Sequence, residues 1–322
     1  MVGKGTAWEE HSQGAELVDG QGQVLLPGFI DTHCHGAAGK SVNDGLQGMK
    51  TVLDFNFANG VARSLLSLIT SSHSELLDLC IQARELLEDS RFAGVHLEGP
   101  YLAHSHKGAH DPARLAVPQN ADLKELIATG VVKSMTVAPE LFDASQLHLL
   151  EESGITLCLG HTGIDYDGAK RFFKEHPNAL VTHAFNGMRG IHHREPGPVP
   201  AAIEAGVFIE LIMDGIHVHE PVAKILPAAQ LLLVTDAMSA TGMPDGSYRL
   251  GSVSVEVKDS IARTPQGGLA GSTLTLAKAV SNYVRVSGSP LAALRAATVN
   301  PARAYGIELP GLSLENHVLL AL

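Results

Sequence analysis

The chain contains an apolar run that ends in two histidines, and it reads Leu26-Pro27-Gly28-Phe29-Ile30-Asp31-Thr32-His33-Cys34-His35-Gly36. In an extended strand the side chains at positions i and i+2 point to the same side, so His33 and His35 converge on one point. The same alternation turns Cys34 away from both imidazoles. We interpret the stretch as one half of a metal site, with two incidental hydrogen-bonded histidines as the alternative.

Short apolar runs recur along the chain and alternate with longer amphipathic stretches. We predict eight strands from them, at residues 24–30, 64–69, 92–97, 132–138, 155–159, 179–182, 207–213 and 231–235. Predicted helices lie at 45–59, 74–89, 122–129, 144–153 and 166–175, with Ser74 and Asp143 as expected N-caps. Strands separated by helices pair in parallel, so eight units predict a closed (β/α)8 barrel of the TIM type. A doubly wound open sheet is the alternative.

One barrel domain is expected over residues 21–308. Residues 1–20 lack strong periodicity and predict a weakly ordered lead-in, and residues 309–322 form a C-terminal tail. Apolar and polar residues alternate around Val253, Val255 and Val257, which predicts a β-hairpin inserted at about 249–270. Helical patterns at 273–287 and 290–304 follow it.

Composition narrows the class of partner. The formal net charge is −11 and no run of Lys or Arg occurs, which argues against nucleic acid and anionic membranes and favours a small molecule. The three cysteines are too few and scattered for a disulfide framework, so we expect a cytoplasmic protein. The first residues hold no apolar signal segment, and no apolar run reaches the ~20 residues of a membrane span.

Polar and ionisable residues follow the predicted strands with unusual regularity. Barrel enzymes gather their chemistry at the carboxyl ends of the strands, so these side chains are expected to meet. After the first strand come His33 and His35, and the later strand ends carry Thr70, Glu98, Glu140, His161, His183, Asp214 with His217, and Asp236. The five side chains with metal-ligand chemistry that a barrel would aim at one centre are His33, His35, Glu98, His161 and His183.

A divalent metal with such ligands lowers the pKa of its bound water towards about 7, which permits hydrolysis of an amide at neutral pH. Asp236 follows the eighth strand directly and suits a general base that returns the proton to the leaving nitrogen. An N-cap is the alternative for Asp236. His110, on the long loop after the third strand, is placed to hold a developing oxyanion, with a solvated loop histidine as the alternative.

Seven segments carry a family resemblance. They are PGFID at 27–31, HLEGPY at 96–101, GHT at 160–162, THAFNGM at 182–188, DGIHV at 214–218, VTDA at 234–237 and AGSTLT at 270–275. On these segments the chain resembles the amidohydrolase superfamily and, within it, the N-acetylglucosamine-6-phosphate deacetylase family. The match runs over about residues 25–306, and its Glu-Gly-Pro and His-x-x-Asn-x-Met motifs are specific to these deacetylases.

The resemblance implies a site residue by residue. It implies a metal held by Glu98, His161 and His183, with Asp236 as the catalytic acid and base and His110 near the acetyl carbonyl. Around the sugar phosphate it implies Asn186, the backbone of Gly187, His217, and Arg194 contributed by the neighbouring subunit. A guanidinium matches phosphate oxygens and is always charged. The resemblance therefore implies a homodimer with Arg194 acting in trans.

Two departures from the family pattern stand out. Some members replace the first-strand histidines, whereas His33 and His35 are both present, which favours a second metal bridged by Glu98 with Asp236 as a further ligand. Zinc is the favoured metal, and iron and manganese accept the same ligands. Family members also begin and end with β-strands that form a small domain, which we expect to be reduced or truncated here.

The predicted function is the hydrolysis of N-acetylglucosamine 6-phosphate to glucosamine 6-phosphate and acetate, in amino-sugar catabolism or cell-wall recycling. One alternative is an amidohydrolase for another amide, such as a cyclic imide or a dipeptide, which has no need of Asn186, His217 and Arg194. A non-catalytic metal-binding relative is the other.

Overall fold

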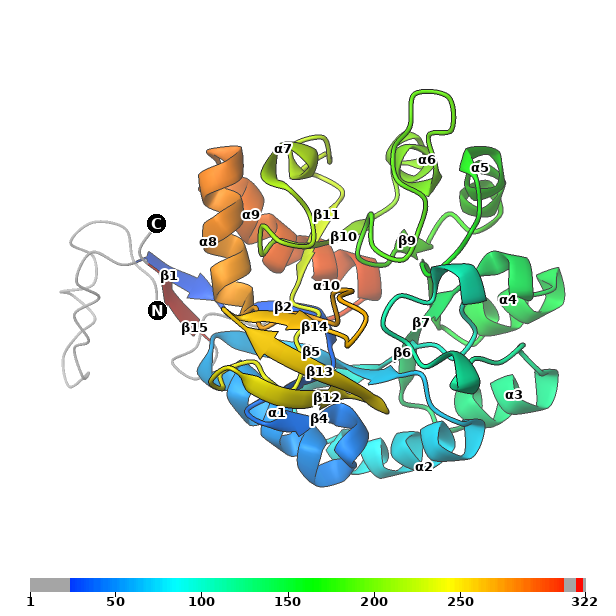
Figure 1. Cartoon of the computed structure of the whole chain (residues 1–322), viewed down its shortest axis with the longest axis horizontal. Helices are drawn as coiled ribbons and strands as arrows, with labels where there is room; N and C mark the ends of the chain where they lie inside the picture. Colours follow the sequence, from blue (N-terminus) through cyan, green and yellow to red (C-terminus); the bar gives the residue numbers. More distant parts are fainter. Residues whose placement is uncertain (1–23, 310–316, 321–322) are drawn as a thin grey trace.

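The computed structural model describes residues 24–309 and 317–320 and confirms the barrel (Figure 1). Eight parallel strands form one sheet in the order β11-β10-β9-β8-β7-β6-β5-β2. They are β2 (Phe29–Cys34), β5 (Val61–Ile69), β6 (Phe92–Glu98), β7 (Val132–Val137), β8 (Thr156–Leu159), β9 (Leu180–Val181), β10 (Ile209–Ile212) and β11 (Leu231–Val234). The ring closes beyond β11, where the Asp236 amide donates to the His33 carbonyl at 2.8 Å and the His35 amide donates to the Ala237 carbonyl at 2.8 Å.

The first predicted strand was placed too early. The run divides at Gly28 into β1 (Val24–Pro27), which leaves the barrel, and β2. β1 pairs antiparallel with β15 (His317–Leu320), so a short two-stranded sheet stands beside the barrel. Pro27 has no amide hydrogen to donate, which suits an edge position and not a central barrel strand. His33 therefore lies within β2, and His35 follows it by one residue. The predicted lead-in, 1–20, lies outside the described residues.

A helix lies at each predicted position around the barrel, with shifts at the ends, and two further helices that the sequence analysis did not predict follow β9 and β10. The helices are α1 (Leu46–Ala58), α2 (His73–Ala83), α3 (Asn120–Ala128), α4 (Ala144–Glu152), α5 (Tyr166–Glu175), α6 (Pro198–Ala205), α7 (Glu220–Ala223), α8 (Leu276–Ser287), α9 (Pro290–Ala297) and α10 (Val299–Tyr305), with 3-10 turns η2 (Val42–Asp44), η3 (Arg84–Leu86), η4 (His104–His106), η5 (Pro112–Arg114) and η6 (Pro139–Leu141). Asp143 caps α4 as predicted. Ser74 is not the cap of α2, because Ser72 and Glu75 form its capping box instead. Thr298 divides the last predicted helix into α9 and α10.

The predicted hairpin belongs to a three-stranded antiparallel sheet that starts earlier. Its strands are β12 (Gly246–Leu250), β13 (Val253–Lys258) and β14 (Ile261–Arg263). Val255 and Val257 are buried together with Leu250, Ile69 and Met238, so the apolar face of this sheet packs onto the rim of the barrel. A shorter pair, β3 (Gly36–Ala37) and β4 (Lys40–Ser41), follows the first barrel strand.

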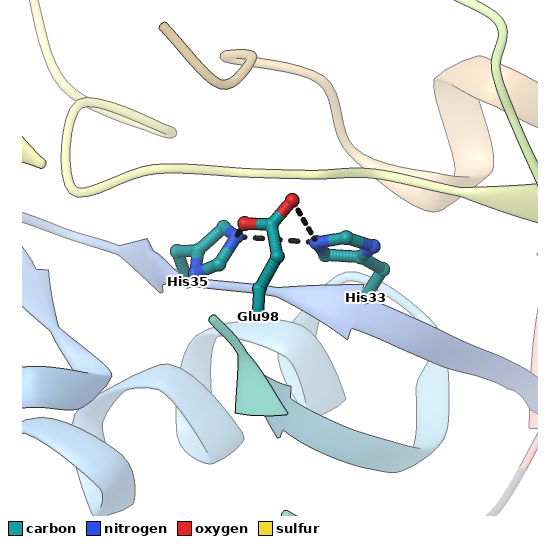
Figure 2. A group of neighbouring side chains, drawn as sticks. All are labelled: His33, His35 and Glu98. Atoms are coloured by element: carbon teal, nitrogen blue, oxygen red, sulfur yellow. Dashed lines mark hydrogen bonds and ion pairs between the residues drawn. The ribbon is translucent and has the colours of Figure 1, made fainter. Parts of the chain in front are cut away.

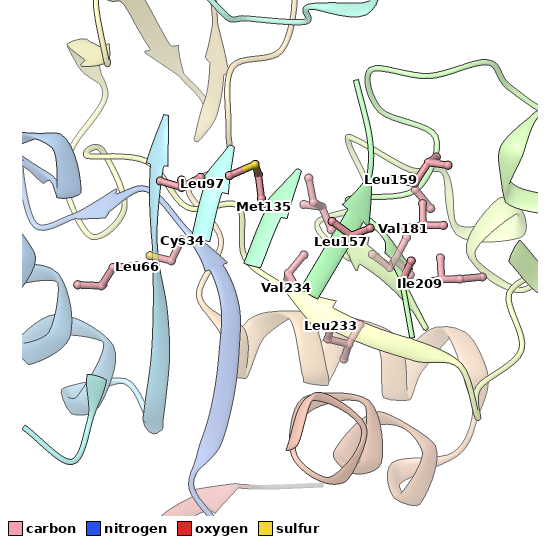
Figure 3. Packing of buried hydrophobic residues seen from close by; sticks show 14 of the residues in the cluster. Cys34, Leu66, Leu97, Met135, Leu157, Leu159, Val181, Ile209, Leu233 and Val234 are labelled. Carbon is pink, nitrogen blue, oxygen red and sulfur yellow. The ribbon is translucent and has the colours of Figure 1, made fainter. Parts of the chain in front are cut away.

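The core lies between the barrel wall and the helices, as Figure 3 shows for part of the cluster. Cys34 belongs to this cluster and is fully buried, so it points away from the two histidines as predicted. Burial raises the pKa of the Cys34 thiol to about 12, which makes it chemically inert. No helix among the described residues is long and apolar enough to cross a membrane.

Candidate metal centre

Glu98, the last residue of β6, lies between four imidazoles. We name His33 and His35 the inner pair, since they come from β2 and the residue after it, and His161 and His183 the loop pair, since each follows its strand by two residues. Glu98 Oε1 lies 3.0 Å from His161 Nε2 and 2.7 Å from His183 Nε2. Glu98 Oε2 lies 2.9 Å from His35 Nε2, and Figure 2 shows the inner pair around this carboxylate. One carboxylate thus contacts both pairs.

The rings are turned so that their Nε2 atoms face the centre. The two Nε2 atoms lie 3.2 Å apart within the inner pair and 3.2 Å apart within the loop pair. Three of the outer Nδ1 atoms contact an acceptor, which is Glu210 Oε2 at 3.1 Å for His33, the Ser67 carbonyl at 3.0 Å for His35, and the His106 carbonyl at 2.8 Å for His161. A carbonyl oxygen only accepts, so a proton on Nδ1 leaves the Nε2 lone pair free. Metal-binding histidines are oriented in this way.

Backbone strain is concentrated at the same centre. His161 has a φ of 47°, His183 of 22° and Asp236 of 47°, values that residues other than glycine rarely adopt. Such strain persists only where the surrounding structure enforces it, and it is concentrated at functional sites. Gly187 also lies against the centre, because a Cβ added at this position would lie only 2.6 Å from His161 Nδ1. The strained residues thus include both imidazoles of the loop pair and the carboxylate of Asp236.

The charges of the centre are mutually stabilising. Burial alone would lower the pKa of His35, but Asp236 and Glu98 outweigh it and raise this pKa to about 9. Burial likewise opposes ionisation of Glu98, yet His110 and His33 hold the pKa of its carboxyl well below the usual value. The pKa of Asp236 is lowered to about 2, because the nearby His35 and His33 outweigh the effect of burial. Ionised carboxylates therefore surround a position that favours positive charge.

This donor set fits a divalent metal ion. Imidazole nitrogens and carboxylate oxygens are the ligands that zinc, iron and manganese accept, and here they converge. Among the described residues that line the cavity at this centre, none is a lysine or an arginine. The carboxylate of Asp236 joins them, with Oδ1 3.3 Å from His35 Nε2 and 3.8 Å from His33 Nε2. The shared Glu98 and the two imidazole pairs offer ligands for two ions.

Glu210 is a residue that the sequence analysis missed. It lies in β10, fully buried, and its Oε2 accepts from the His183 amide at 3.2 Å besides facing His33 Nδ1. The Tyr305 hydroxyl donates to its Oε1 at 3.1 Å. A buried carboxylate is stable only when it is paired in this way. The one available signal was an acidic residue inside an otherwise apolar strand, Val207 to Met213.

A cavity of about 320 Å³ opens directly onto the centre. Besides the ligands it is lined by other predicted site residues, namely His110, Asn186, Gly187, His217 and Asp236. Part of its remaining wall comes from Leu250, Thr264, Gly268 and Leu269, so the three-stranded sheet and the segment after it form a roof that the sequence analysis did not foresee. The cavity is large enough for a small ligand.

His110 and His217 face this cavity in different states. His110 Nδ1 lies 2.7 Å from Thr70 Oγ1, and burial lowers its pKa to about 4, so the ring is neutral at pH 7. His217 Nδ1 lies 2.6 Å from Asp214 Oδ2. Burial opposes protonation of His217, but Asp214 outweighs it and raises the pKa of the ring above its usual value. His217 is thus the ring suited to an anion.

Two residues of the predicted set lie elsewhere. Arg194 is exposed on the loop between β9 and α6, with its guanidinium 2.6 Å from His193 Nε2, and does not line the cavity. Glu140 accepts from the Thr162 hydroxyl at 2.6 Å and the Gly163 amide at 2.7 Å, so it supports the turn after β8 instead of joining the centre.

The sequence of the chain matches one protein family and is similar to those of two deacetylases. Residues 24–311 match the Amidohydrolase family. The chain is 36% identical over 300 residues to an N-acetylgalactosamine-6-phosphate deacetylase from Escherichia coli O157:H7, covering 89% of this chain and 79% of that protein. It is 36% identical over 305 residues to an N-acetylglucosamine-6-phosphate deacetylase from Vibrio furnissii, covering 90% of this chain and 76% of the relative.

The structure of the chain also superposes on solved structures of deacetylases. A mutant N-acetyl-D-glucosamine-6-phosphate deacetylase from Mycobacterium smegmatis, in complex with N-acetyl-D-glucosamine-6-phosphate, superposes with a TM-score of 0.86 at 33% identity over 92% of this chain and 83% of its own. An N-acetylglucosamine-6-phosphate deacetylase from Thermotoga maritima gives a TM-score of 0.85 at 32% identity over 95% and 86%. The chain therefore belongs to the amidohydrolase family, among its deacetylases of N-acetylated amino-sugar phosphates.

Proposed function

We propose that the chain is a metal-dependent deacetylase that hydrolyses N-acetylglucosamine 6-phosphate to glucosamine 6-phosphate and acetate. The observation that carries the proposal is Glu98, which contacts both imidazole pairs at the base of the cavity. The same cavity is lined by Asn186, Gly187 and His217, which a phosphosugar needs and a bare amide does not. The lining of the cavity therefore favours a phosphosugar as the substrate over a cyclic imide or a dipeptide.

Glu98, His161 and His183 would hold one metal ion, and His33, His35 and Asp236 would join Glu98 around a second. When bound, such an ion lowers the pKa of a coordinated water and polarises the acetyl carbonyl. Zinc is the favoured metal because the ligands are imidazoles and carboxylates. Iron or manganese would be held by the same groups.

Asp236 and His110 supply the proton chemistry in this proposal. Asp236 is ionised at neutral pH, so its carboxylate accepts the proton of the attacking water and then delivers it to the leaving nitrogen. His110 is neutral and also lines the cavity, with Nε2 3.4 Å from Glu98 Oε2. A neutral ring that carries its proton on the nitrogen facing the cavity donates to the acetyl oxygen as negative charge develops there.

His217, Asn186 and the backbone of Gly187 would bind the phosphate. Asp214 keeps His217 protonated to higher pH, so this ring offers a charged donor to phosphate oxygens. The side-chain amide of Asn186 donates to the carbonyls of His183 and Ala184, each at 3.2 Å. Contact between this nitrogen and a phosphate therefore requires the amide to turn.

We further propose a homodimer in which Arg194 reaches the phosphate of the neighbouring subunit. Arg194 is exposed and is not among the residues that line the cavity of its own chain, which supports this role. A mixing experiment tests it with Arg194→Ala and Asp236→Asn, each impaired alone. If Arg194 acts in trans, a mixed dimer has one complete site and mixing restores activity. Activity that stays at the level of the separate variants contradicts the proposal.

Kinetics of acetate release test the substrate. We expect turnover of N-acetylglucosamine 6-phosphate and a much lower kcat/KM for unphosphorylated N-acetylglucosamine, whereas equal values would contradict the phosphate assignment. N-acetylgalactosamine 6-phosphate belongs in the same assay, because a relative that acts on this epimer is as similar as one that acts on the gluco sugar. Three buried free thiols agree with the predicted cytoplasmic location, which stays a prediction.

A further inference from the structure

A second group of metal-ligating side chains lies away from the centre just described. His148 and Glu151 come from α4, and His176 is the residue after α5. One potential ligand atom from each of the three lies within 4.8 Å of the others. His176 Nδ1 is 2.6 Å from Glu151 Oε2, and His148 Nδ1 is 3.8 Å from the same oxygen. The carboxylate thus stands between two imidazoles, as Glu98 does in the barrel.

The local sequence places these three side chains near one another before any ligand binds. His148 and Glu151 are three residues apart on one helix, so their side chains project from the same face. Pro177 disfavours helical backbone at the residue before it, which ends α5 at Glu175 and turns His176 aside with a ψ of 71°. The His176 ring packs against Phe172 with a centroid distance of 4.9 Å and is only 2% exposed. One imidazole is therefore held rigidly in place.

The group spans two helices, and a groove of about 750 Å³ lies between them. Of the three side chains in the group, His176 lines this groove, together with Leu147 from α4 and Phe172 from α5. α4 and α5 are neighbours on the outside of the barrel (Figure 1). Both end where the next strand begins, so the group lies towards the amino ends of the strands, opposite the catalytic face. Features at that end of a barrel serve stability instead of chemistry.

We propose that His148, Glu151 and His176 form a zinc site that links α4 to α5. Zinc takes imidazole and carboxylate ligands at about 2.0–2.1 Å in a tetrahedron, which places ligand atoms ~3.3 Å apart. His176 and Glu151 must separate by less than 1 Å from their 2.6 Å contact, and the His148 side chain, 59% exposed, is free to turn inward. A water molecule completes the fourth position. Two imidazoles select zinc over calcium or magnesium.

Zinc binding and heat stability test the proposal without relying on catalysis. Full-length protein is stripped with a chelator, reloaded with zinc, dialysed and analysed for zinc per chain. Glu151→Gln should retain one zinc fewer per chain than the parent, whereas Glu152→Gln, which removes the same charge from the next residue of α4, should retain the parent's content. The zinc-induced rise in unfolding temperature should be smaller in Glu151→Gln than in Glu152→Gln.

A second variant guards against misfolding. The His148 side chain is 59% exposed, so we expect His148→Ala to fold and to lose one zinc as well, with deacetylase kcat unchanged once the catalytic metal is supplied. Equal zinc content in the parent, Glu151→Gln and His148→Ala would overturn the proposal. The same conclusion would follow if zinc raised the unfolding temperature of all three proteins by the same amount.

Discussion

The inner pair and the loop pair contact the same carboxylate, yet the chain builds them differently. Both Nε2 to Nε2 distances are 3.2 Å. The inner pair belongs to the barrel wall, and both of its Nδ1 atoms contact buried acceptors. The loop pair stands on residues with positive φ, and His183 Nδ1 has no hydrogen-bond partner among the described residues. Buried acceptors therefore hold both rings of the inner pair, whereas His183 in the loop pair depends more on Glu98 and a metal ion.

Asp236 is the residue with the largest expected effect, because it lies between the inner pair and the substrate cavity. Asp236→Asn keeps the shape but accepts no proton, so kcat should fall by ~10²–10⁴, the usual contribution of a general acid and base. Acetate release under saturating substrate measures it, with metal content as the control. Turnover equal to that of the parent would remove Asp236 from its assigned role.

Substitutions in the two pairs should then separate their roles. His183→Ala removes a ligand from the site with Glu98 and His161, so we expect loss of the essential ion and of nearly all activity. His33→Ala removes a ligand of the second ion only, so we expect loss of that ion and a smaller loss of activity than in His183→Ala. Metal analysis and kcat of both variants provide the measurement. Equal damage from both variants would mean that the two pairs act as one unit.

The sequence predicted the inner pair but not Glu210, which contacts it, and the difference has a physical reason. Period-2 geometry identifies His33 and His35 from local spacing alone. The strand ends identify Glu98, His161, His183 and Asp236 because a parallel barrel brings all carboxyl ends to one face. Glu210 escaped because an acidic residue within a strand gains meaning only when the partners inside the barrel are known. The roof of the cavity escaped because it depends on how the three-stranded sheet docks onto the rim.

The backbone strain at the centre could not be predicted from the sequence either. The positive φ values fall on His161, His183 and Asp236, residue types that give no local signal for such a conformation. The division of the first apolar run was different, since Pro27 and Gly28 marked it in the sequence. A proline before the barrel strand should have moved its predicted start to Phe29.

Glu210 offers a way to weaken the inner pair more than the loop pair, because it faces the imidazole of His33 but only the backbone amide of His183. Glu210→Gln removes the charge that faces His33 Nδ1, so zinc affinity at the inner pair should fall by ~10–100-fold while the loop pair keeps its ion. Tyr305→Phe is the matched control, since it removes only the hydroxyl that donates to Glu210 Oε1 at 3.1 Å. Zinc titration with a competing chelator measures both. Unchanged affinity in Glu210→Gln would show that the carboxylate does not orient the ring.

The smallest expected effect is on the pH dependence of KM, through His217 in the phosphate-binding part of the cavity. Because Asp214 raises the pKa of His217, the charged ring should persist to higher pH, and KM should rise as pH passes through that raised value. Asp214→Asn should shift the rise in KM to lower pH and increase KM by about 10-fold near neutrality, since a charged hydrogen bond contributes ~1.5–3 kcal/mol. kcat should change little. Superimposable KM profiles for parent and variant would contradict the role of His217.

The central claim is that one carboxylate and two imidazole pairs bind metal ions, and the zinc content of the purified chain tests it most directly. The Glu151→Gln variant is the right protein, because it lacks the site proposed between α4 and α5. After reloading with zinc and dialysis, elemental analysis should find about two zinc ions per chain, the number that the paired His and carboxylate ligands accommodate. A chain that retains neither zinc nor any other divalent metal would contradict the account.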